Sequence, residues 1–131
     1  MIALDTNVLV RFLVEDDAAQ SRRARRLIAS AIAANEVCFV SDVVLCELVW
    51  VLQVSYRIER KAIMEVLTQL FFARHILFAS HDRISRTLDA FRAGRGDFAD
   101  YLVREHARTA GCPAVATFDR ALLKEDGFVS P

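Results

Sequence analysis

The sequence predicts a mixed α/β fold in which a mostly parallel sheet is covered by helices on both faces. Short apolar segments alternate along the chain with longer segments of helical pattern, as they do where helices join the strands of a parallel sheet. The chain has 131 residues, of which 54% are hydrophobic, and this suits one compact domain with a sizeable core. It contains no repeat, linker or low-complexity segment. Residues 1–131 are therefore predicted to form a single domain.

The first half of the chain is predicted to hold two strands and three helices: strands 1–4 and 37–40, and helices 18–34, 43–54 and 57–72. The first strand is an apolar run that ends at Asp5. The first helix is rich in Ala, Arg and Leu, which favour helix. The second helix is apolar on nearly every face, with Ser41 or Asp42 as its N-cap. The third helix is amphipathic.

The second half is predicted to continue the alternation, with strands 75–79, 113–118 and 127–129 and helices 84–93, 97–110 and 119–123. Gly94-Arg95-Gly96 lacks the Lys-Ser/Thr of a phosphate loop, so it is interpreted as a turn between two helices. Gly111 ends the second of these helices, as a C-terminal glycine often does.

The molecule has no net positive charge that would attract nucleic acid. Lys and Arg number 17, Asp and Glu also number 17, and the formal net charge is zero. Binding to RNA would have to come from a local patch or from metal. One candidate patch is an arginine cluster on predicted helix 18–34, formed by Arg22, Arg23, Arg25 and Arg26. It is either a phosphate-contacting surface or a solvated helix face.

Other residue types point to a cytoplasmic protein without a thiol or zinc site. The cysteines are odd in number and show no paired spacing: Cys38, Cys46 and Cys112. The histidines show no metal-ligand spacing either: His75, His81 and His106. The longest apolar runs fall well short of the roughly 20 residues of a membrane span, and no secretory signal is recognised.

Two acids directly follow apolar strands. Asp5 comes after the first strand and Asp119 after strand 113–118. Ligands of open parallel α/β sheets bind beyond the carboxyl ends of the strands, so these two positions are candidate functional residues. The alternative is that each is a helix N-cap, a position that Asp favours.

Three further acids lie on predicted helices. Glu47 is the only charge between Val43 and Leu52, and burying an unpaired carboxylate would cost several kcal/mol. It should therefore reach a cleft or meet a cation, and a structural salt bridge is the alternative. Asp97 and Asp100 are three residues apart near a helix start and share a face. Capping within a solvated acidic turn is the other interpretation of this pair.

Acids that approach one end of a sheet repel one another unless cations lie between them. Oxygen ligands of this kind suit Mg²⁺ or Mn²⁺, and paired ions can activate a water and stabilise the leaving oxygen in phosphodiester hydrolysis. The acids therefore predict a site for Mg²⁺ or Mn²⁺, ions that suit phosphodiester hydrolysis.

At these acids the chain resembles a known family. Asp5-Thr6-Asn7, Glu47 within Cys46-Glu47-Leu48, the stretch 97–102 and Thr117-Phe118-Asp119 are similar, in order, to the four acidic motifs of PIN-domain proteins. The nearest resemblance is to VapC-type toxins of bacterial toxin–antitoxin pairs.

This resemblance implies a three-layer α/β/α sandwich, Mg²⁺- or Mn²⁺-dependent endoribonuclease activity, an RNA substrate, a cognate antitoxin and a homodimer. The implied catalytic and metal-binding residues are Asp5, Glu47, Asp100 and Asp119. The implied supporting residues are Thr6, Asn7, Asp97 and Thr117. Asp97 and Asp100 can both be aligned with the third motif. We assign Asp100 to metal, because Asp97 would cap the helix with its carboxylate on backbone N–H groups.

Three other functions are alternatives to a ribonuclease. A catalytically silent PIN scaffold would serve as an interaction module, but such a protein is expected to have lost an acid. A phosphatase of the haloacid-dehalogenase type would carry a second Asp where Asn7 stands, and the Asp16-Asp17 pair lies too far downstream for a receiver domain. Four large apolar residues form an antitoxin groove or belong to the core: Phe12, Leu13, Trp50 and Phe72.

Overall fold

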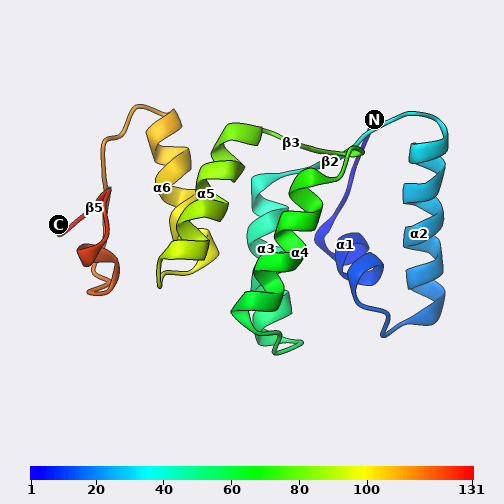
Figure 1. The fold of residues 1–131 in the computed structure, drawn as a ribbon, viewed down its shortest axis with the longest axis horizontal. Helices are drawn as coiled ribbons and strands as arrows, with labels where there is room; N and C mark the ends of the chain where they lie inside the picture. Colours follow the sequence, from blue (N-terminus) through cyan, green and yellow to red (C-terminus); the bar gives the residue numbers. More distant parts are fainter. The chain divides into compact units, whose positions relative to one another are not determined.

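The computed structural model describes residues 1–131 and divides into two compact units, Met1–Ala79 and Ser80–Pro131. Each unit is described by itself. Figure 1 labels the helices and strands along the chain.

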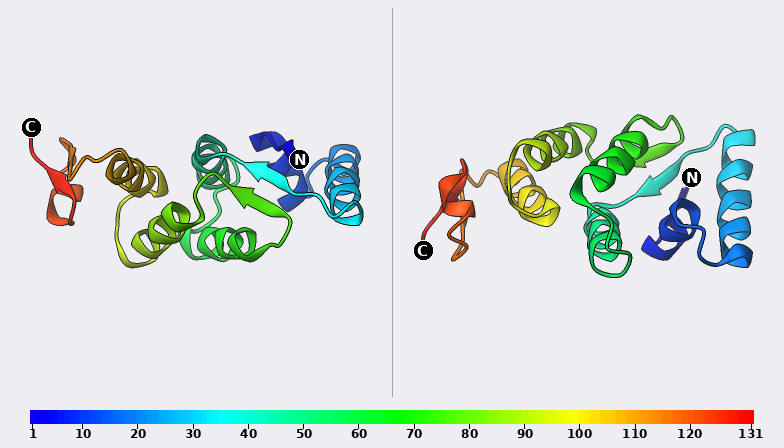
Figure 2. Two further views of the ribbon diagram at one scale, coloured as in Figure 1. Left: turned by 90° about the horizontal axis from the view of Figure 1, so that it is seen from above. Right: turned by 60° about the horizontal axis from the view of Figure 1, so that its bottom comes forward.

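The first unit is a three-stranded parallel sheet with its connecting helices. Its elements are β1 (Ile2–Ala3), α1 (Thr6–Leu13), α2 (Ala18–Ala33), β2 (Cys38–Val40), α3 (Asp42–Val54), α4 (Arg60–Phe72) and β3 (Ile76–Phe78). The strand order is β1-β2-β3, with Ile2 opposite Cys38 and Cys38 opposite Ile76. Figure 2 shows helices of this unit on both sides of the strands.

The core of the first unit forms where α1 and α3 pack together beside the central strand. Leu9 of α1, Cys38 of β2 and Leu48 of α3 are fully buried. The start of α3 is capped by Ser41, whose Oγ accepts a hydrogen bond from the Val44 N–H at 3.2 Å. This cap fixes where the helix begins, directly after β2.

The second unit packs two helices together and ends in a two-stranded parallel sheet. Its elements are α5 (His81–Ala93), α6 (Phe98–Thr109), β4 (Val115–Ala116), a 3₁₀ turn η1 (Leu122–Lys124) and β5 (Phe128–Val129). Phe91 of α5 and Phe98 of α6 are fully buried and meet edge to face at 5.7 Å between ring centroids. Gly111 follows α6 with φ +93°, which is the left-handed conformation that suits a glycine after a helix.

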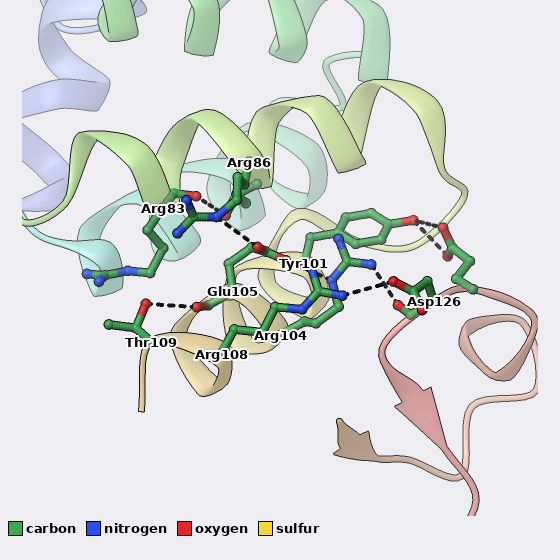
Figure 3. A network of polar contacts seen from close by, with 10 residues as sticks. Arg83, Arg86, Tyr101, Arg104, Glu105, Arg108, Thr109 and Asp126 are labelled. Carbon is green, nitrogen blue, oxygen red and sulfur yellow. Dashed lines mark hydrogen bonds and ion pairs between the residues drawn. The ribbon is translucent and has the colours of Figure 1, made fainter. Parts of the chain in front are cut away.

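A buried carboxylate organises the second unit (Figure 3). Glu105 is fully buried, and its two oxygens accept hydrogen bonds from three arginines. Arg86 donates to Oε1 at 3.1 Å, while Arg104 and Arg108 donate to Oε2 at 2.9 and 2.8 Å. Arg108 also reaches Asp126 at 3.1 Å. The network links α5, α6 and the segment before β5, and the charge of Glu105 is compensated on both oxygens.

The structure confirms the predicted class, a mixed α/β protein with parallel strands, and corrects several boundaries. α1 (Thr6–Leu13) corresponds to none of the predicted helices. α4 begins at Arg60 rather than at residue 57, because Arg57 has φ +52° and cannot lie in a right-handed helix. The helix predicted at 119–123 is a 3₁₀ turn at residues 122–124. None of the helices combines the length and hydropathy that crossing a bilayer requires.

Candidate active site

Asp5 lies at the carboxyl end of β1, where the sequence placed it. The residue before it, Leu4, still pairs with the sheet through its N–H, which donates to the Phe39 carbonyl at 2.8 Å. Asp5 then starts α1 as its N-cap, and its Oδ1 accepts the Thr6 N–H at 2.8 Å. The side chain is exposed. Asp5 is thus both a cap and an accessible carboxylate, with Oδ2 free of hydrogen bonds.

Glu47 lies on the exposed face of α3, so the expectation that its carboxylate is surrounded by apolar residues is wrong. The same face exposes Val43, Trp50 and Val54 by 66%, 61% and 54%, so α3 is not buried all round. Glu47 therefore stays in water and forms no ion pair, which removes the structural salt bridge as an explanation for it. Its carboxylate is available as a ligand.

Three more acids gather around Asp100 in the second unit. Asp100 is partly buried, and desolvation raises its pKa above the ordinary value. The negative charges of Asp97, Asp119 and Glu125 raise the pKa further, and a backbone hydrogen bond from Asp97 lowers it. Negative charges of this kind around Asp100 favour a bound proton or a bound cation at its carboxylate.

Asp97 is the N-cap of α6, as predicted. The carboxylate of Asp100 was expected to be free of hydrogen bonds, but it accepts one. Its Oδ2 accepts the backbone N–H of Asp97 at 3.0 Å, which is the side-chain half of a capping box. The carboxylate three residues into the helix thus reaches back to the N-cap residue, which corrects the expectation that it would be free. Oδ1 of Asp100 accepts no hydrogen bond.

Asp119 caps the 3₁₀ turn, as its alternative interpretation held. Its Oδ1 accepts hydrogen bonds from the Ala121 and Leu122 N–H groups at 2.8 and 3.3 Å. The Asp119 N–H donates to Thr117 Oγ1 at 3.1 Å, so Thr117, the first residue after β4, restrains the backbone of Asp119. These bonds fix the direction of the side chain and leave Oδ2 without a hydrogen bond.

Tyr101 and Glu125 belong to this acidic region and were missed in the sequence. The Tyr101 hydroxyl accepts the Gly96 N–H at 2.8 Å and donates to Glu125, with the oxygens 2.7 and 2.8 Å away. A Cβ at Gly94 would collide with the same hydroxyl. Tyr101 thus ties the start of α6 to the segment before β5. No local pattern indicates a contact across 24 residues.

The thiols of Cys38 and Cys46 offer no alternative chemistry. Burial, together with the nearby acids Asp42 and Glu47, raises the pKa of the Cys46 thiol to about 11. Burial also raises the pKa of Cys38. Both thiols are protonated at neutral pH and are poor nucleophiles.

The donor set fits a hard divalent cation. Asp5 and Glu47 in the first unit, and Asp100 and Asp119 in the second, supply only carboxylate oxygens, and Mg²⁺ and Mn²⁺ prefer oxygen. Within neither unit do three such side chains come close enough to hold a metal ion. The crowding around Asp100 is the feature that a cation would relieve.

Parallel strands joined by helices, with carboxylates at strand ends and helix starts, define a class of α/β proteins suited to metal-assisted chemistry. The chain matches the PIN domain over residues 2–127, a span that includes parts of both units, and it belongs to the PIN-domain family. PIN domains are generally nucleases that bind RNA and use divalent metals. No curated protein matches the chain.

Proposed function

We propose that this chain is an endoribonuclease dependent on Mg²⁺ or Mn²⁺, built as a single PIN domain over residues 1–131. The observation that supports this most directly is the PIN match over residues 2–127 in a chain that retains an acid at each of the four motifs. The proposed metal ligands are Asp5, Glu47, Asp100 and Asp119. A bound divalent ion would supply an activated water and stabilise the leaving oxygen of the phosphodiester.

The chain's own residues orient three of these ligands, Asp5, Asp100 and Asp119. The Thr6 N–H holds Oδ1 of Asp5, and the Asp97 N–H holds Oδ2 of Asp100. Thr117 steadies the backbone of Asp119. In each case a hydrogen bond holds the carboxylate or its backbone, and one oxygen stays available. Such fixed outer contacts commonly decide how well a metal site binds.

We further propose that the chain is the toxin of a type II toxin–antitoxin pair, of the VapC type, which acts in the cytoplasm and forms a homodimer. An accessible apolar surface supports a protein partner. Trp50 on α3 is 61% exposed and Phe72 at the end of α4 is 75% exposed, whereas Phe12 and Leu13 are partly buried. Large exposed apolar residues are typical of surfaces that bind another protein.

The activity test is cleavage of structured RNA by the purified protein with Mg²⁺ or Mn²⁺, and with a chelator. Cleavage should require the metal and stop on chelation. Unchanged cleavage in chelator would exclude metal dependence. Tight Mn²⁺ binding without cleavage of any RNA tested would favour the silent scaffold instead.

A further inference from the structure

A cavity of about 430 Å³ lies between α1 and α2 in the first unit. Its size falls within the roughly 300–1,000 Å³ of small-molecule sites. Val8, Ala24 and Leu27 give it an apolar wall, and Asn7, Arg11, Gln20 and Arg23 give it polar groups. None of the proposed metal ligands lines it.

Arg11 is held rigidly at this cavity. Its Nε donates to Gln20 Oε1 at 2.6 Å, and one terminal nitrogen donates to Asp16 at 2.8 Å and to the Tyr56 hydroxyl at 3.2 Å. These contacts compensate its charge and fix the plane of the guanidinium. A fixed guanidinium plane is a surface on which a nucleobase can stack.

Arg23 differs from Arg11 because its charge is not compensated. It is exposed, and it forms no ion pair or side-chain hydrogen bond, whereas Arg25 on the same helix pairs with Glu15. An unpaired guanidinium at the edge of a cavity suits a phosphate, which it can bind through two parallel N–H groups.

The remaining polar groups suit the edge of a base. The amide of Asn7 offers a donor and an acceptor, and the amide of Gln20, whose Oε1 accepts from Arg11, offers its N–H donors. Such groups read base edges in single-stranded RNA. The cavity therefore combines the unpaired guanidinium of Arg23, the fixed guanidinium of Arg11, two amides and an apolar wall. A nucleotide has a phosphate, a planar base and polar base edges that these groups can bind.

We propose that this cavity binds one nucleotide of the RNA substrate, with the phosphate on Arg23 and the base against Arg11 and the apolar wall. The proposal rests on the proposed ribonuclease function. Asn7 follows Asp5 by two residues in the first turn of α1, so the bound nucleotide lies beside the proposed cleavage site.

The test titrates the wild-type protein, in chelator, with the four ribonucleoside 5′-monophosphates and with ribose 5-phosphate. Amide chemical shifts and dissociation constants are measured. At least one nucleotide should bind about tenfold more tightly than ribose 5-phosphate and shift the amide signals of Asn7, Gln20 and Arg23. Arg23→Gln should weaken nucleotide binding about tenfold, as expected for loss of a charge-assisted contact.

Arg22→Gln is the matched control, because Arg22 is exposed on the same helix and does not line the cavity. It should change the affinity less than about twofold. Equal losses in both variants, equal binding of ribose 5-phosphate, or shifts confined to other residues would overturn the proposal. The titration contains no metal and no cleavable phosphodiester, so its outcome is separate from that of the cleavage test.

Discussion

The backbone N–H of Asp97 donates a hydrogen bond to Oδ2 of Asp100 at 3.0 Å, so the two acids of the third motif have unequal roles. Asp97 fixes where α6 begins, and Asp100 presents a carboxylate that is already oriented. The partly buried residue of the pair is Asp100.

Asp100→Asn should abolish RNA cleavage and weaken Mn²⁺ binding by more than the roughly 10–100-fold that loss of an outer partner costs. The amide oxygen can still accept the Asp97 N–H, so α6 should keep its start. Asp97→Asn retains a good capping side chain and should keep most of both properties. Parallel kinetics and metal titration compare the two variants, and the opposite ranking would reverse the assignment.

Without metal, Asp100→Asn should stabilise the protein. The wild-type carboxylate is desolvated and surrounded by Asp97, Asp119 and Glu125, and the neutral amide removes that repulsion. We expect thermal unfolding in chelator to shift upward by about 2–4 °C, or roughly 1 kcal/mol or less. Saturating Mn²⁺ should reverse the order of the two proteins. A lower melting temperature in chelator would show that the crowding is not destabilising.

Tyr101→Phe should loosen the acidic region. It removes the hydrogen bonds to the Gly96 N–H and to Glu125, and we expect a loss of about 1–3 kcal/mol in the free energy of unfolding. Cleavage should fall as well, because the turn that positions Asp97 is less restrained. Denaturant unfolding and single-turnover kinetics measure the two effects.

Tyr56→Phe is the control for that stability measurement, since its hydroxyl also bonds a carboxylate, Asp16 at 2.7 Å, in an exposed setting. It should cost less than about 1 kcal/mol. Equal losses of stability in the two variants would contradict a special role for Tyr101.

Glu105→Gln should be strongly destabilising. It removes the buried negative charge with which Arg86, Arg104 and Arg108 all pair. Breaking such a buried ion network lowers the free energy of unfolding by about 3–5 kcal/mol. Asp89→Asn, which breaks an exposed pair with Arg92, should cost less than about 1 kcal/mol. Urea unfolding of both variants checks the contrast, and similar losses would refute it.

The sequence predicted the parallel α/β class and the place of Asp5 after the first strand, because an apolar strand followed by an acid is a local pattern. The strand predicted at 113–118 is only Val115–Ala116 in the structure, so Asp119 does not directly follow a strand. The sequence prediction missed α1, whose buried Leu9 and Val10 lie on a different face from Asn7 and Arg11, because in a helix of eight residues this pattern extends over only about two turns. It misjudged the setting of Glu47, because apolar residues on every side of a helix do not reveal that Val43 and Trp50 face solvent. Long-range contacts such as Tyr101 with Glu125 depend on the fold and leave no local signal.

The central claim is that Asp5 and Asp100 are both metal ligands, each needed for RNA cleavage. A Mn²⁺ titration of the wild type, Asp5→Asn, Asp100→Asn and the control Asp97→Asn tests it most directly. Asp5→Asn and Asp100→Asn should each lose more than about tenfold in affinity, whereas Asp97→Asn, which keeps every proposed ligand, should lose less. Wild-type affinity in Asp5→Asn or in Asp100→Asn would contradict the claim.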